Sequence, residues 1–297
     1  MPASLLMVFA SLLFATMGVC VKLASAYYDA GEIVLYRSLI GVVILVGISR
    51  WRGQSLRTTV PAMHFWRSLS GVLALSLWFY SLGKLPLATA MTLNYMSSVW
   101  MALFLIGGGV LLGSARVDAR LVAVVLLGFF GVALVLRPTL DQKQLWHGLA
   151  GLASGMLAAL AYLQVTALGR AGEPVYRIVF YFSLGGVVAG ALTAVAAGNV
   201  HPHSLKGLAL LLAVGLLATA AQLMMTHAYG TGKTLVIASL QYLGIVFSFV
   251  YGALLFGDAL TAAAMTGIGL IVVAGLAATW LSNRSAPVDN PHSIIES

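Results

Sequence analysis

The chain is a succession of long, uninterrupted apolar stretches, and this feature limits the folds open to it more than any other. A helix needs about 20 apolar residues to cross the roughly 30 Å of hydrocarbon in a bilayer. Short polar or Pro/Gly-containing segments separate ten stretches of about that length, which predicts ten membrane-spanning helices. The stretches cover residues 4–23, 32–49, 66–83, 88–112, 119–137, 147–169, 176–197, 206–228, 234–256 and 260–282.

Composition supports the same class of protein. Hydrophobic residues make up 61% of the 297 residues and charged residues 8%, whereas a soluble domain carries about 25% charged residues. Ten spans leave no room for a separate soluble domain, and continuous apolar runs exclude a transmembrane β-barrel. Cys20 is the sole cysteine, so the chain has no internal disulfide. We therefore expect an all-α polytopic membrane protein.

The net charge of +8 fits membrane topology better than a nucleic-acid partner, because the basic residues lie between the apolar stretches. The first stretch has no basic residue before Lys22, so we expect a retained helix and not a signal peptide. If the N-terminus is cytoplasmic, the inner segments hold ten Lys and Arg against five outside, which favours cytoplasmic placement of both termini. The ten are Arg50, Arg52, Arg57, Arg67, Arg116, Arg120, Arg170, Arg177, Lys233 and Arg284.

An internal repeat divides the chain. Residues 32–43 (EIVLYRSLIGVV) and 177–188 (RIVFYFSLGGVV) agree at eight of twelve positions. In nearly the same register, Asn94-Tyr95 falls over Gln241-Tyr242. We therefore expect two five-helix units, residues 1–138 and 145–284, followed by a polar cytoplasmic tail, 285–297. Because five is odd, the second unit is inverted relative to the first, an arrangement typical of alternating-access transporters.

Two five-helix units, with Gly113-Ser114 and Gly257-Asp258 closing the fourth and ninth helices, resemble the drug/metabolite transporter superfamily, specifically its EamA-type members. The resemblance covers about residues 4–282. The family's motif usually ends in Gly-Glu after a proline-containing helix, whereas here Ser114 and Asp258 follow the glycines and neither helix has an internal proline. The length and the uncharged, aromatic-rich core look most like YddG-type exporters of aromatic and other amino acids. The resemblance implies peripheral fifth and tenth helices around a cavity formed by the others.

Acidic residues are placed only in loops, tails or helix ends, at Asp29, Glu32, Asp118, Asp141, Glu173, Asp258, Asp289 and Glu296. Proton-coupled transporters need an intramembrane group that titrates, usually a carboxylate, so we expect a facilitator driven by the substrate gradient. No His-Glu-x-x-His or Gly-x-Ser-x-Gly motif and no pair of buried carboxylates is present, which argues against an enzyme. We expect no cofactor and no metal.

Polar residues inside the apolar stretches are the candidates for substrate binding, because each is costly to expose to lipid. Asn94 and Gln241, each followed by tyrosine (Tyr95 and Tyr242), occupy equivalent positions and could line a central site or bind across helices. With Gln164, they are expected to orient the amino and carboxylate groups of a substrate. Trp78, Tyr80, Trp100 and Tyr162 lie deep in their stretches and would pack against its side chain.

Three further candidates have two interpretations each. Lys22 could snorkel to the membrane surface or attract a substrate carboxylate. Arg37 could bind a carboxylate or pair with Glu32. His227, in the eighth stretch, could be a structural histidine or a proton relay.

These features together predict a multi-pass inner-membrane exporter of amino acids with broad selectivity, working as a monomer or weak homodimer by alternating access. A multidrug exporter is one alternative, because an aromatic cavity can also hold a cation. A nucleotide-sugar or phosphometabolite antiporter is another, and it would need several buried basic residues. A non-transporting membrane scaffold is the third.

Overall fold

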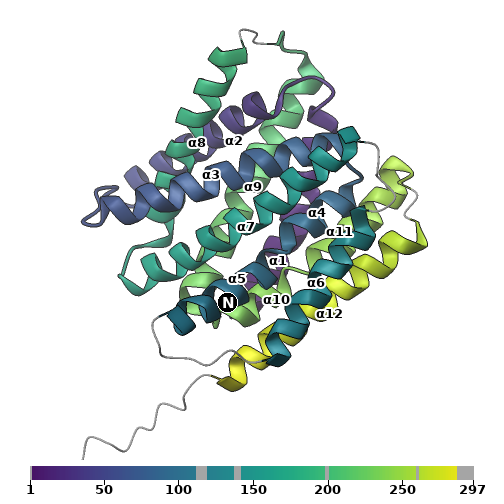
Figure 1. The fold of residues 1–297 in the computed structure, drawn as a ribbon. Coiled ribbons are helices and arrows are strands. Elements are labelled where there is room, and N and C mark those ends of the chain that lie inside the picture. Colours follow the sequence, from purple (N-terminus) through teal and green to yellow (C-terminus); the bar gives the residue numbers. More distant parts are fainter. Residues whose placement is uncertain (1, 112–118, 137–141, 198–200, 259–260, 286–297) are drawn as a thin grey trace, which may run out of the picture.

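The structure, a computed structural model, describes residues 2–111, 119–136, 142–197, 201–258 and 261–285, and in these residues it is a bundle of helices (Figure 1). The predicted Gly113-Ser114 motif and residues 286–297 of the predicted tail lie outside the described residues. The helices are α1 (Ala3–Ala24), α2 (Ala30–Trp51), α3 (Pro61–Lys84), α4 (Leu87–Tyr95), α5 (Ser97–Leu111), α6 (Ala119–Leu136), α7 (Gln142–Arg170), α8 (Val175–Ala197), α9 (Leu205–Thr231), α10 (Thr234–Leu240), α11 (Leu243–Tyr251) and α12 (Ala262–Ser285).

Helices occupy each of the ten apolar stretches in the described residues. In the part of the chain that the structure describes, six helical segments are long and apolar enough to cross a membrane: α1, α2, Leu145–Arg170 of α7, Val175–Ala196 of α8, α9, and Val236–Phe256. The segment Val236–Phe256 ends in a π-helical turn, Gly252–Phe256, followed by Gly257 at φ 61°. This left-handed conformation favours glycine and ends the helix.

Two of the ten stretches are broken in the middle, which the sequence did not predict. The fourth is interrupted at Met96, between α4 and α5, and the ninth at Gln241 and Tyr242, between α10 and α11. Neighbouring glycines let other groups approach both breaks. A side chain at Gly155 of α7 would lie 2.6 Å from the carbonyl oxygen of Leu93, and one at Gly244 would lie 2.6 Å from the Tyr95 hydroxyl.

Four helix pairs make the most extensive contacts: α3 with α7, α1 with α9, α2 with α8, and α6 with α12. Helices α6 and α12 lie together at one edge of the bundle, and α2 and α8 lie near the opposite edge (Figure 1). Between α2 and α8 the contacts are reciprocal, since Ser38 faces Gly186 and Ser183 faces Gly41. Small residues at these positions let the two backbones come close.

Candidate functional site

A small cavity of about 50 Å³ lies in the middle of the bundle. Helices α1, α2, α3, α4, α7, α8 and α9 all contribute side chains to its wall. The wall is mostly apolar, with a few polar groups pointing inward, which is the usual make-up of a small-molecule site. The lining residues are Phe14, Arg37, Arg67, Gly71, Ala74, Leu75, Trp78, Asn94, Ala158, Ala161, Tyr162, Phe182, Gln222 and Met225.

Two arginines dominate the electrostatics of this cavity. Arg37 of α2 and Arg67 of α3 are 3% and 2% exposed. Their guanidinium carbons lie 4.9 and 4.3 Å from the centre of the same aromatic ring, Phe182 of α8. A cation over an aromatic face is attracted by the ring's quadrupole, but the ring carries no net charge. Glu32 pairs with the His201 ring, and Nε and Nη1 of Arg37 have no hydrogen-bond partner among the described residues, so the expected alternative that Arg37 pairs with Glu32 is wrong.

Arg67 was assigned from the sequence to a cytoplasmic segment, and the structure corrects this. Because α3 begins at Pro61, not near residue 66, Arg67 lies almost two turns inside the helix. Gly71, one turn further on, makes room for it, because a side chain at Gly71 would collide with Arg67 Nη1. Without Arg67, the charge count is nine to five and still favours cytoplasmic termini.

Four of the residues predicted to bind substrate line this cavity: Arg37, Trp78, Asn94 and Tyr162. Asn94 Nδ2 also donates to Ser154 Oγ at 3.0 Å. Sequence reasoning missed Arg67, Phe14, Phe182, Gly71 and Gln222 as parts of one site. The sequence marks Gln222 as a polar residue inside an apolar stretch. Phe14 and Phe182 carry no such signal, because phenylalanine is common in apolar stretches.

Four other predicted residues lie in the layer around the cavity. Gln241 lies beside Tyr162 and Tyr229, whose rings stack with their centres 5.0 Å apart. Gln164 accepts a hydrogen bond from Ser70 at 2.7 Å. Tyr95 packs against Gly244, and Tyr242 is buried near Ser98. The second broken helix therefore reaches the cavity indirectly, through the contact of Gln241 with Tyr162.

The remaining four predicted residues are outside the cavity. Lys22 Nζ pairs with Asp258 at 3.2 Å and donates to the carbonyl oxygen of Leu85 at 3.3 Å, so it neither snorkels freely nor lines the cavity. Tyr80 is 39% exposed and packs on His147.

Trp100 and His227 complete this group. Trp100 stacks on Phe104, with the ring centres 6.2 Å apart. His227 is exposed near the end of α9, which does not suit a buried proton relay.

One end of the bundle is held by a carboxylate, Glu173, in the connection between α7 and α8. It accepts hydrogen bonds from His64 Nε2 at 3.0 Å, Thr58 Oγ1 at 3.1 Å and Arg177 Nη1 at 3.1 Å. Burial tends to raise the pKa of Glu173, but the bonds from His64 and Thr58 and the charge of Arg177 outweigh it and lower the pKa. Arg177 Nη2 also donates to the carbonyl oxygen of Ser55.

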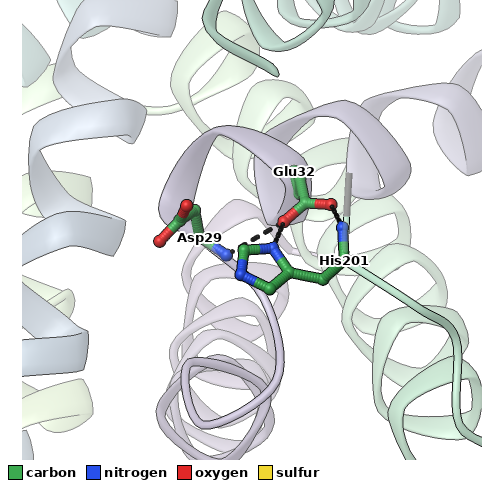
Figure 2. Close-up of side chains that lie close together, drawn as sticks. All are labelled: Asp29, Glu32 and His201. Carbon is green, nitrogen blue, oxygen red and sulfur yellow. Dashed lines mark hydrogen bonds and ion pairs between the residues drawn. The ribbon is translucent and has the colours of Figure 1, made fainter. Parts of the chain in front are cut away.

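The other end of α2 carries a similar pair. Glu32, in the first turn of α2, accepts hydrogen bonds from the backbone N–H groups of Asp29 at 3.2 Å and His201 at 2.9 Å, and pairs with the His201 ring (Figure 2). Asp29, Glu32 and His201 each offer a ligand atom within 4.8 Å of the others, a spacing that could hold a metal ion. Both Glu32 oxygens already accept hydrogen bonds, so the geometry favours a Glu–His pair that joins the first turn of α2 to the connection between α8 and α9.

Comparisons with known proteins agree with this architecture. Residues 1–137 match the EamA-like transporter family. The pseudopaline exporter CntI of Pseudomonas aeruginosa (strain UCBPP-PA14) is 32% identical over 273 residues, covering 92% of this chain and 94% of its own. The riboflavin transporter of Rhizobium johnstonii is 29% identical over 75% of this chain. A solved crystal structure with 21% identity covers 95% of this chain at a TM-score of 0.69, which shows a shared fold.

Apolar helices surrounding a small, partly polar cavity, together with these relatives, define a multi-pass membrane transporter. The chain belongs to the EamA-like transporter family. The narrower resemblance to YddG-type aromatic amino-acid exporters is not supported, since two relatives with 32% identity over 273 residues are named pseudopaline exporters. That resemblance rested on the length and on an uncharged, aromatic-rich core, and the buried Arg37 and Arg67 show that the core is charged.

Proposed function

We propose that this protein exports small amino-acid-derived metabolites across the inner membrane by alternating access. The observation that carries the proposal is the central cavity, with α4 ending at its wall in a broken helix. Broken helices at the middle of a bundle present backbone and side-chain polar groups to a substrate. Asn94, Trp78 and Tyr162, which line it, would contact the substrate.

Inverted repeats, 1–138 and 145–284, are part of the proposal, as are ten membrane spans. The packing supports them, because exchanging equivalent helices of the two halves turns the α3–α7 pair into α9–α1 and leaves α2–α8 and α6–α12 unchanged. The reciprocal Ser38–Gly186 and Ser183–Gly41 contacts follow the same exchange. The breaks near residues 96 and 241 fall at nearly equivalent positions.

A cavity of about 50 Å³ is far below the roughly 300 Å³ or more of most ligand sites. The helices around it must therefore separate to admit a substrate, as rocking of one repeat against the other would allow. The acidic side chains that the structure describes lie at helix ends or in connections, at Asp29, Glu32, Glu173 and Asp258. This placement supports transport down the substrate gradient.

The test is efflux of labelled metabolites from proteoliposomes, with and without a pH gradient. Ala161→Trp would fill the cavity and abolish flux, whereas Ala167→Trp, on an exposed position of the same helix, would leave it intact. Pseudopaline is the first substrate to try because of the relative's name, followed by amino acids. Equal flux through both tryptophan variants would contradict the assignment of the cavity, and dependence on a pH gradient would contradict the facilitator.

An exporter of cationic drugs would also use an aromatic cavity. Two buried arginines in the wall disfavour a cation there, so anionic or zwitterionic metabolites are the better candidates. A phosphometabolite antiporter gains support from Arg67, which provides a second buried basic residue.

A further inference from the structure

Arg37 and Arg67 bring two positive charges into a cavity whose lining residues include no acidic side chain. We propose that these two arginines recognise substrates that carry two carboxylate groups. The proposal rests on the proposed function and names the class of substrate that the same cavity would take.

The hydrogen-bonding capacity of the wall points to an acceptor-rich ligand. Among the described residues, Nε and Nη1 of both arginines are buried without a hydrogen-bond partner. Trp78 Nε1 and Gln222 Nε2, which also belong to the wall, are likewise buried without a hydrogen-bond partner. All six atoms are N–H donors, and buried donors are normally satisfied. A ligand rich in acceptor oxygens would satisfy them together.

Charge sets the number of carboxylates. Two like charges close together in a low-dielectric interior repel each other, and a buried charge is stable only when it is paired. Phe182 offers each guanidinium an aromatic face but no neutralising charge. One carboxylate would leave one guanidinium unpaired, whereas two would pair both, each matched by a planar guanidinium fork.

The two halves of the chain are not equivalent here. In the repeat alignment, Arg37 corresponds to Phe182. The ring and the guanidinium that lie against each other thus come from matching positions, and only the first half contributes the charge. Gly71 supports Arg67 specifically, because its missing side chain leaves the space that Nη1 occupies.

Stability of the full-length protein in detergent gives a test that needs no transport. Arg67→Met removes an uncompensated buried charge while keeping most of the volume, so without ligand it should melt at a higher temperature than the wild type. L-glutamate should raise the wild-type melting temperature more than L-glutamine does, and this difference should vanish in Arg37→Met and Arg67→Met. Arg50→Gln, an exposed arginine on α2, is the control and should keep the difference.

Transport in proteoliposomes gives the second test. L-glutamate and L-glutamine differ in one carboxylate, and the wild type should favour glutamate at least tenfold, a preference that Arg67→Met should remove. Gly71→Ala, which displaces the Arg67 side chain, should weaken it. Equal behaviour of the two probes, or stronger stabilisation by inorganic phosphate, would overturn the dicarboxylate assignment. Transport of glutamine at the same rate in the wild type, Arg37→Met and Arg67→Met would overturn the dicarboxylate assignment but would be consistent with the proposed exporter. Absence of flux for every metabolite tested would contradict the exporter itself.

Discussion

Asn94 has two possible roles, contact with substrate and the joining of two helices. Its side chain lines the cavity, and it also donates to Ser154 Oγ on α7, which in turn donates to the carbonyl oxygen of Gly151. If Asn94 contacts substrate, its loss removes hydrogen bonds that no neighbour replaces. If it only joins α4 to α7, deleting either partner has the same effect.

We expect Asn94→Ala to lower transport about tenfold or more, since a hydrogen bond to a charged group contributes about 1.5–3 kcal/mol. Ser154→Ala removes the same interhelical bond but leaves Asn94 in the wall, and its flux should stay within about twofold of wild type. Initial rates of counterflow in proteoliposomes measure both. Equal losses of flux in the two variants would assign Asn94 to helix packing alone.

At the scale of the helix, close approach of α2 and α8 depends on glycine. A side chain at Gly190 would lie 2.6 Å from the backbone nitrogen of Leu35 and 2.7 Å from its Cα, and backbone atoms cannot move aside as a flexible side chain can. A side chain at Gly47, which lies on α2 whereas Gly190 lies on α8, would have nothing within 4 Å.

We therefore expect Gly190→Ala to destabilise the protein by about 1–3 kcal/mol, the usual cost of overpacking. Gly47→Ala should be neutral or stabilise by about 0.5–1 kcal/mol, because alanine is the better helix former. Thermal unfolding in detergent compares the two variants. A Gly190→Ala protein as stable as Gly47→Ala would mean that α2 and α8 are further apart than described.

The Glu173 cluster makes a prediction about pH. The pKa of the Glu173 carboxyl group is lowered in the folded protein. The stabilisation from its charged form is therefore complete above the ordinary glutamate pKa of about 4.3 and is lost as the pH falls through the lower pKa of the folded state. Thr58, His64 and Arg177 are the groups that bond it. Melting temperature should fall on acidification below about pH 4.5, and Glu173→Gln should be less stable at pH 7 but show a weaker fall. Parallel curves for the two proteins would exclude Glu173 as the group responsible.

Helices were predictable from the sequence because the length of an apolar run is set by the membrane and not by the neighbours. The breaks at Met96 and Gln241 were not, since neither contains the proline that usually interrupts a helix. Arg67 was missed for a related reason. With His64 and Trp66 beside it, the start of α3 has the composition of a membrane interface, and the ring that holds Arg67, Phe182, comes from the other half of the chain.

In the whole molecule, two Glu–His pairs lie at opposite ends of α2 and α8. Each joins a carboxylate at the start of the second helix of one half to a histidine near the start of the third helix of the other: Glu32 with His201, and Glu173 with His64. On the predicted topology the first pair is on the outer face and the second on the cytoplasmic face. Both Glu–His contacts are formed in this structure, which agrees with the small volume of the cavity.

If these pairs hold the two halves together, breaking one should open the cavity toward its own side. A cysteine placed at Ala74, which lines the cavity and is 4% exposed, reports this in a protein whose Cys20 is replaced by serine. His201→Ala should speed labelling of Ala74→Cys by an impermeant maleimide added from the outside, and His64→Ala should speed labelling from the inside. Right-side-out and inside-out vesicles separate the two directions. Faster labelling from both sides in either variant would mean general loosening of the bundle, and the pairs would then serve stability, not access.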